Sequence, residues 1–174
     1  MAQLEQEGAD VLGITLYELM QRAGQAAYEH LTAHWPEASH WLILCGHGNN
    51  GGDGYVLARL GKAAGKTITV LACESEKALP EEAQRARDAW LDAGGEIHAA
   101  DAAWPEQIYV IVDALLGTGS NRAPEAPYAT LIQRANAPAV PTVAIDIPYR
   151  KSVVLGNSVD SGGRRIIKQS TQLL

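Results

Sequence analysis

The stretch CGHGNNGGDGYVLARL, residues 45–60, joins an apolar run to a segment with helical spacing. Its glycines permit tight turns and close backbone approach, while Asn49, Asn50 and Asp53 add oxygen acceptors. GHGNNG, which begins at Gly46, matches the G-x-G-x-x-G pattern of dinucleotide-binding loops, although one such match is weakly specific. The composition of the loop therefore predicts that its glycine backbone amides bind an anion. It also predicts that its side-chain amide oxygens bind a hard cation or polar groups of a ligand.

Outward from this loop, apolar runs of strand length alternate with segments of helical spacing. The expected strands are residues 41–45, 67–72, 96–99, 108–113 and 141–146, and the expected helices lie before residue 36 and in 53–65, 79–95 and 127–137. Strands that are apolar throughout must be covered on both faces, as in a parallel sheet between helical layers. The sequence predicts a three-layer α/β/α, Rossmann-like fold with a mainly parallel sheet.

Local signals mark where the helices begin and end. Thr15 and Glu18 have the spacing of a capping box, and Asp53 is the expected N-cap of the helix after the glycine-rich loop. Gly65 and Gly94 are the expected stops of the next two helices.

Composition narrows the function classes. The 174 residues are 47% hydrophobic, which suits one compact domain, and the formal net charge of −6 gives no general attraction for nucleic acid. Cys45 and Cys73 adjoin apolar runs and are expected to be small buried side chains, and no His/Cys spacing indicates zinc. The four tryptophans are expected to be packing residues. Without a basic leader or a long apolar run, we expect a soluble, cytoplasmic protein that does not enter the membrane.

Polar residues follow three of the expected strands. In parallel sheets ligands bind beyond the carboxyl ends of the strands, so the loops after residues 45, 113 and 146 are expected to lie on one edge. Asp113 and Asp146 are candidate site residues, although each could also stabilise the turn that follows its strand. His47 is a candidate base, with a hydrogen bond to the backbone as the alternative. Glu74 lies where a ribose-binding acid would fall in a dinucleotide-binding domain.

Three motifs together carry a family resemblance. GNNGGDGYVLAR, VDALLGTG and VAIDIP resemble the YjeF N-terminal domain family, the NAD(P)HX epimerases, and ITLYELMQRAGQAAYEHL is similar to the first helix of that family. The resemblance runs from about Ala9 to Pro148, so residues 1–148 are expected to form this domain. It implies epimerisation of the C6 R and S forms of hydrated NADH and NADPH in nicotinamide nucleotide repair. It also implies a dehydratase partner, commonly a fused C-terminal domain that this chain lacks, and is compatible with a homodimer.

The resemblance also implies roles for particular residues. Asp113 would be the acid/base group or a ligand of a potassium ion, and Asn50 would supply that ion with a further oxygen. The residues expected to bind the substrate are Asn49, Asn50, Gly51, Gly52, Asp53, Gly117, Thr118, Gly119, Ser120, Asn121, Arg122, Ala123 and Asp146.

The sequence departs from the family pattern after Pro148. Tyr149 stands where the family has a serine that binds potassium, so the potassium site is expected to be incomplete. Residues 149–174 show no sustained period and are expected to be a divergent tail, derived from a frameshift, from a truncation or from cloning, with natural divergence as the alternative.

Two other function classes stay open on the sequence. G-x-G-x-x-G with Glu74 favours an NAD-binding oxidoreductase domain, although no separate substrate domain is present. A non-catalytic, dimerising interaction module is the other, because the same fold serves that role in some proteins. Retention of NNGGDG together with Asp113 favours the enzyme.

Overall fold

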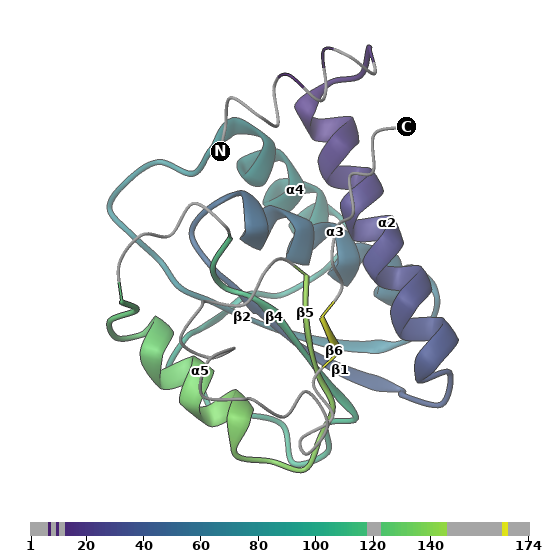
Figure 1. Cartoon of the computed structure of the whole chain (residues 1–174), viewed down its shortest axis with the longest axis vertical. Helices are drawn as coiled ribbons and strands as arrows, with labels where there is room; N and C mark the ends of the chain where they lie inside the picture. Colours follow the sequence, from purple (N-terminus) through teal and green to yellow (C-terminus); the bar gives the residue numbers. More distant parts are fainter. Residues whose placement is uncertain (1–6, 8–9, 11–12, 118–122, 146–164, 167–174) are drawn as a thin grey trace.

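The computed structural model describes residues 7, 10, 13–117, 123–145 and 165–166. These residues form one sheet with the strand order β3-β2-β1-β4-β5-β6, in which every neighbouring pair is parallel. The strands are β1 His40–Cys45, β2 Thr67–Ala72, β3 His98–Ala99, β4 Val110–Ala114, β5 Thr142–Ala144 and β6 Arg165–Ile166. The helices are α2 Leu16–His34, α3 Asn49–Ala63, α4 Glu81–Asp92 and α5 Tyr128–Asn136 (Figure 1). The predicted fold class is confirmed.

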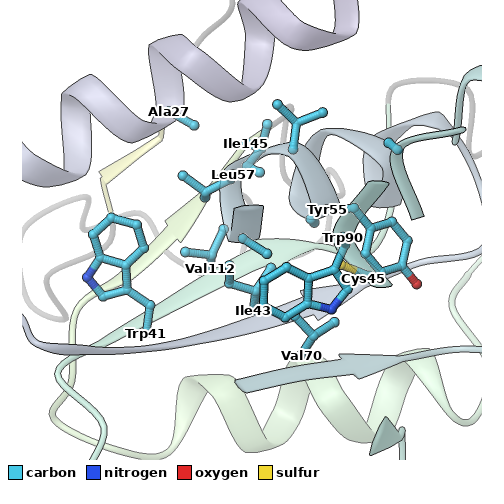
Figure 2. Packing of buried hydrophobic residues seen from close by; sticks show 14 of the residues in the cluster. Ala27, Trp41, Ile43, Cys45, Tyr55, Leu57, Val70, Trp90, Val112 and Ile145 are labelled. Carbon is cyan, nitrogen blue, oxygen red and sulfur yellow. The ribbon is translucent and has the colours of Figure 1, made fainter. Parts of the chain in front are cut away.

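Helices cover both faces of the sheet, with α2, α3 and α4 on one side and α5 on the other (Figure 1). Successive side chains of β1 therefore enter different cores. Trp41, Ile43 and Cys45 belong to the core beneath α2, α3 and α4, part of which is seen in Figure 2, whereas Leu42 and Leu44 belong to the core beneath α5. This two-sided burial explains why the strand is apolar at every position rather than at alternate ones.

The capping box predicted at the start of α2 is present. The Glu18 amide donates to Thr15 Oγ1 at 3.1 Å, and the Thr15 amide donates to Glu18 Oε2 at 2.7 Å. The Glu18 carboxylate accepts from the Thr15 amide and, at 2.9 Å, from the Thr15 hydroxyl, and these two bonds hold its pKa below its ordinary value, the amide contributing most. The helix thus begins where two local side chains satisfy its exposed donors.

Thr15→Ala is expected to lower the free energy of unfolding by about 1 kcal/mol, because the first turn of α2 loses its cap. Thr32→Ala is the matched control on the same helix, since the Thr32 hydroxyl donates back to the Tyr28 and Glu29 carbonyls, at 2.9 and 3.1 Å, and caps no helix end. Urea unfolding of both variants measures the difference. Equal stability of the two variants would contradict a contribution from the cap.

The predicted ends of α3 and α4 are also confirmed. Gly65 and Gly94 have φ angles of +81° and +76°, the left-handed conformation that glycine adopts without a Cβ clash. The tryptophans pack as expected: Trp41 and Trp90 are buried, and their ring N–H groups donate to the Ala38 and Glu96 carbonyls at 3.0 Å. The other two tryptophans are partly buried against the two cores.

The direction of winding reverses between β1 and β4. The chain leaves β1 through α3 to reach β2 on one side, and leaves β4 through α5 to reach β5 on the other. β1 and β4 are neighbours in register, with Cys45 opposite Ala114. In open α/β sheets such a switch point leaves a crevice at the carboxyl ends of the two strands, where ligands bind. The site is therefore expected between the loops after β1 and β4.

Most of the predicted tail, 149–174, lies outside the described residues, so its origin stays a prediction. Arg165 and Ile166 form β6 and pair with Val143 and Ala144 of β5. Within the described part of the chain, no helix has the length and apolarity needed to cross a membrane.

Candidate functional site

The glycine-rich loop lies directly against the end of β4. The Gly46 amide donates to the Ala114 carbonyl at 2.9 Å, and a Cβ on Gly46 would overlap the carbonyl oxygen of Leu115. Glycine is required here by close backbone approach. This contact places the loop after β1 beside the strand end that carries Asp113, as the strand-end argument predicted.

Helix α3 begins earlier than predicted. Its first residue is Asn49 and its N-cap is Gly48, with an extended φ of −164° and no side-chain cap, so the prediction that Asp53 caps this helix is wrong. The Gly52 amide already donates to the Gly48 carbonyl at 3.2 Å. A Cβ on Gly51 would overlap the carbonyl of Gly46, so only glycine lets the first turn coil this tightly onto the loop. Asp53 is instead half-buried within the helix.

The two glycines at 51 and 52 face different surroundings. A Cβ on Gly51 would meet the loop, whereas a Cβ on Gly52 would meet the Met20 side chain at 2.6 Å and Ala83 at 3.0 Å, on α2 and α4. The structure thus places Gly52 where helices pack together. Its predicted part in substrate binding stays a prediction.

Asn49 and Asn50 occupy the first turn of α3, at the switch point. Both Oδ1 atoms are buried and have no hydrogen-bond partner among the described residues, and Asn50 is only 9% exposed. A buried amide oxygen without a partner costs about 1–3 kcal/mol. The arrangement therefore favours a bound group that donates to these oxygens or coordinates them.

Asp113 is the penultimate residue of β4, between β1 and β5. It is opposite Leu44 and Ala144 in the two parallel ladders, and its backbone carbonyl accepts from the Ile145 amide at 3.1 Å. Its side-chain Oδ1 accepts from the Leu115 amide at 3.1 Å, which is the turn contact considered as an alternative. The half-buried carboxylate is thus oriented by the turn at the same edge as the asparagines.

The remaining predicted residues fall in two groups. Gly117 and Ala123 are described and bracket the loop after β4. Thr118, Gly119, Ser120, Asn121, Arg122 and Asp146 lie outside the described residues, so their roles stay predictions.

Two sequence candidates are engaged elsewhere. The exposed Glu74 carboxylate lies 3.7 Å from the Arg87 guanidinium, a surface ion pair between the loop after β2 and α4. The His47 ring nitrogen Nε2 lies 2.6 Å from the Lys77 carbonyl, the backbone contact that was the alternative to a catalytic base. Sequence reasoning missed Tyr128, whose hydroxyl accepts from the His47 amide at 2.9 Å across 81 positions of the chain. No local pattern in the sequence signals that contact.

Cys45 and Cys73 are free and buried, as predicted. Burial raises the pKa of the Cys73 thiol to about 12 and raises that of Cys45 still further, so both stay protonated and unreactive. Among the described residues no group of three or more His, Cys, Asp or Glu side chains could hold a metal ion. In this part of the chain, single carboxylates and amide oxygens are therefore the candidate ligands for a cation.

A separate hollow of about 780 Å³ lies on the helical face, lined by residues of α2, α3 and α4 that include Tyr17, Arg59 and Arg85. The Arg85 guanidinium stacks over the Tyr17 ring at 4.0 Å. None of the predicted site residues that the structure describes lines this hollow. The switch point is therefore the better candidate for chemistry, since the Asn49 and Asn50 Oδ1 atoms lie there without a partner among the described residues.

The chain is similar to several known proteins. Residues 16–150 match the family described as YjeF-related protein N-terminus. The chain is 62% identical over 144 residues to a bifunctional NAD(P)H-hydrate repair enzyme of Escherichia coli, covering 83% of this chain and 28% of the relative. It is 36% identical over 138 residues to an NAD(P)H-hydrate epimerase of Limosilactobacillus fermentum, covering 79% and 65%. The chain thus spans less than two thirds of either relative.

A solved structure shows the same fold. The crystal structure of a yeast protein superposes with a TM-score of 0.73 at 25% sequence identity, covering 84% of this chain and 67% of the yeast chain.

Proposed function

The chain belongs to the family of YjeF-related protein N-termini, and on that premise we propose that it interconverts the C6 R and S forms of hydrated NADH and NADPH. Relatives named NAD(P)H-hydrate epimerase and bifunctional NAD(P)H-hydrate repair enzyme support this reaction. The structural observation that carries it is the pair of buried Oδ1 atoms of Asn49 and Asn50, without partners among the described residues, at the switch point of the sheet. A nucleotide carries hydrogen-bond donors that could bind these oxygens.

The start of α3 suits the phosphates and ribose of such a ligand. A helix N-terminus carries partial positive charge, and Gly48 brings no side chain to block an approaching group. No described residue lies within 4 Å of the Gly48 Cβ position. The first turn has no acidic residue to repel an anion. We propose that Asn49 and Asn50 bind the nucleotide here, together with the loop 117–123, of which residues 118–122 lie outside the described part of the chain.

Asp113 is the proposed acid/base group. Inverting C6 requires the carbon–hydroxyl bond or the ring C–N bond to break and to re-form on the other face, and a proton must be delivered to the departing oxygen or nitrogen and then removed. One carboxylate can give that proton and take it back, typically worth about 10² to 10⁴ in rate. The Leu115 amide, at 3.1 Å from Oδ1, keeps the Asp113 side chain in one orientation for this task.

Potassium is a proposed cofactor. Its preferred ligands are oxygens, and the Oδ1 atom of Asn50, buried and without a partner among the described residues, fits that requirement. Asp113 directly precedes Ala114, whose carbonyl binds the Gly46 amide, so the end of β4 adjoins the asparagine loop. A bound cation would supply positive charge that offsets a carboxylate and the substrate phosphates. Asn50 and Asp113 would hold it.

A dehydratase is the proposed partner. The relatives named as bifunctional repair enzymes are much longer than this chain, which spans 28% of the Escherichia coli protein. Epimerisation lets a dehydratase specific for one epimer act on both, so the two activities belong together. A cytoplasmic location and a homodimer stay predictions.

The test of the function starts from one purified epimer of hydrated NADH. We expect the protein to produce the other epimer, followed by chromatography, faster than buffer or heat-denatured protein does. The same assay is run on hydrated NADPH. Conversion at the rate of the buffer control with both substrates would overturn the proposed reaction.

If potassium binds at this site, the melting temperature of the protein should depend on potassium, and this can be measured without an activity assay. Tyr149, which lies outside the described residues, stands where the family has a serine, so KCl is expected to raise the melting temperature only slightly more than choline chloride at equal ionic strength. Tyr149→Ser should enlarge the potassium-specific shift, and Asn50→Ala should abolish it. Strong stabilisation of the unaltered chain that saturates at millimolar potassium would contradict an incomplete site.

A further inference from the structure

Two loops and the start of helix α5 are tied together at the carboxyl edge of the sheet by two hydrogen bonds that meet at His47. The Tyr128 hydroxyl accepts from the His47 amide at 2.9 Å, and the His47 ring nitrogen Nε2 lies 2.6 Å from the Lys77 carbonyl. His47 belongs to the loop after β1, Lys77 to the loop after β2, and Tyr128 to the first turn of α5, which follows β4. We call these three residues the loop clasp.

The clasp joins the two faces of the sheet. Helix α5 lies on the face opposite α3 (Figure 1), and the Tyr128 ring packs against the core beneath α5 while its hydroxyl reaches the loop that leads into α3. Desolvation raises the pKa of the Tyr128 hydroxyl, so the phenol stays neutral near pH 7. A neutral phenol anchored in a packed core is a fixed acceptor rather than a mobile one.

The bond fixes the loop immediately before the proposed ligand groups. His47 precedes Gly48, the N-cap of α3, and Asn49 and Asn50 follow, whose Oδ1 atoms have no partner in the described part of the chain. Gly48 has no side chain to hold the backbone at this point, and no side chain caps the helix. Glycines leave the backbone of this loop more conformational freedom than other residues would. The clasp restrains that freedom through contacts from other parts of the chain.

We propose that Tyr128 and His47 are positioning residues, which hold the glycine-rich loop in the conformation that binds the nucleotide. The role in nucleotide binding rests on the proposed function. The clasp acts through loop order, so it contributes mainly to binding and little to the chemical step. Lys77 contributes only its backbone carbonyl to the clasp, which accepts from the His47 ring.

The first experiment measures the order of the loop directly and needs no activity assay. In the unliganded full chain, amide hydrogen exchange by NMR is expected to be at least about tenfold faster at His47 in Tyr128→Phe than in the unaltered protein, because the amide loses its acceptor. Tyr109→Phe is the matched control, since Tyr109 is 47% exposed and lies just before β4, at the opposite end of the strand from the clasp. Unchanged exchange at His47 in Tyr128→Phe would overturn the clasp.

The second experiment measures the effect of the clasp on nucleotide binding. Tyr128→Phe is expected to weaken NADP⁺ binding in calorimetry and to raise KM for the hydrated substrate about 2- to 10-fold, the change that loss of one hydrogen bond gives, with kcat within about twofold. His47→Leu should act similarly, and His47→Gln, which keeps a side-chain N–H donor, should recover part of the loss. Equal affinity in Tyr128→Phe and the unaltered protein, despite faster exchange, would overturn the positioning role.

The two proposals fail in different ways. An unaltered protein that neither binds NADP⁺ nor interconverts the epimers would overturn the proposed function and, with it, the role of the clasp in nucleotide binding. The exchange result at His47 would still decide whether Tyr128 orders the loop.

Discussion

Asparagine in place of Asp113 is expected to slow interconversion of the epimers by about 10² or more, because an amide cannot deliver a proton and take it back. Asparagine keeps an oxygen that can accept from the Leu115 amide, so the turn after β4 is expected to survive. Nucleotide affinity should therefore fall less than turnover. The measurement starts from a pure epimer and follows both forms by chromatography, with calorimetry for binding.

Two further variants separate catalysis from the turn. Asp113→Ala removes both the proton carrier and the acceptor for Leu115, and is expected to lose stability as well as rate. Asp101→Asn is the control for a change of charge, since Asp101 is exposed in the connection between β3 and β4. A wild-type rate in Asp113→Asn would assign this residue to the turn alone.

Valine in place of Gly51 is expected to lower the free energy of unfolding by about 3 kcal/mol, the upper range for overpacking. A Cβ at this position would overlap the Gly46 carbonyl, so the loop and the first turn of α3 must separate. That shift would also move Asn49 and Asn50, so the variant should lose nucleotide binding under conditions in which it is still folded. Urea unfolding and calorimetry measure the two effects.

Gly48→Ala is the matched control for the same loop. None of the residues that the structure describes lies within 4 Å of the Cβ position of Gly48, and its φ of −164° is open to any residue. Alanine is a poorer N-cap than glycine, so a loss of up to about 1 kcal/mol is expected. If Gly51→Val were as stable as Gly48→Ala, the close approach of the loop to α3 would be wrong.

The sequence by itself determined most of the elements and the edge on which the site lies. The strand 41–45 is apolar at every position because both its faces are covered, and the residue types alone reveal that pattern. The Thr15 cap and the glycine stops at 65 and 94 depend on neighbours within a few residues. Such signals are local, so the sequence contains them in full. The strand-end rule then placed Asp113 beside the glycine-rich loop.

Only the tertiary structure decided where α3 starts and how its glycines are used. Asp53 has the right chemistry for an N-cap, yet the helix begins at Asn49, because the absence of a Cβ on Gly46 and Gly51 lets the first turn close against the loop. The sequence treats Gly51 and Gly52 alike, whereas the structure turns one toward the loop and the other toward Met20. These choices follow from which atoms lie opposite each glycine.

Long-range hydrogen bonds were likewise invisible in the sequence. Tyr128 and His47 are 81 positions apart, and their bond exists because β1 and β4 are neighbours at the switch point of the sheet. The burial of the Asn49 and Asn50 oxygens, which have no partner within the described ranges, also depends on the completed fold. A sequence names the residue types that a site needs. Which of their atoms are bonded, and which are left for a ligand, is set by the packing of segments distant in the chain.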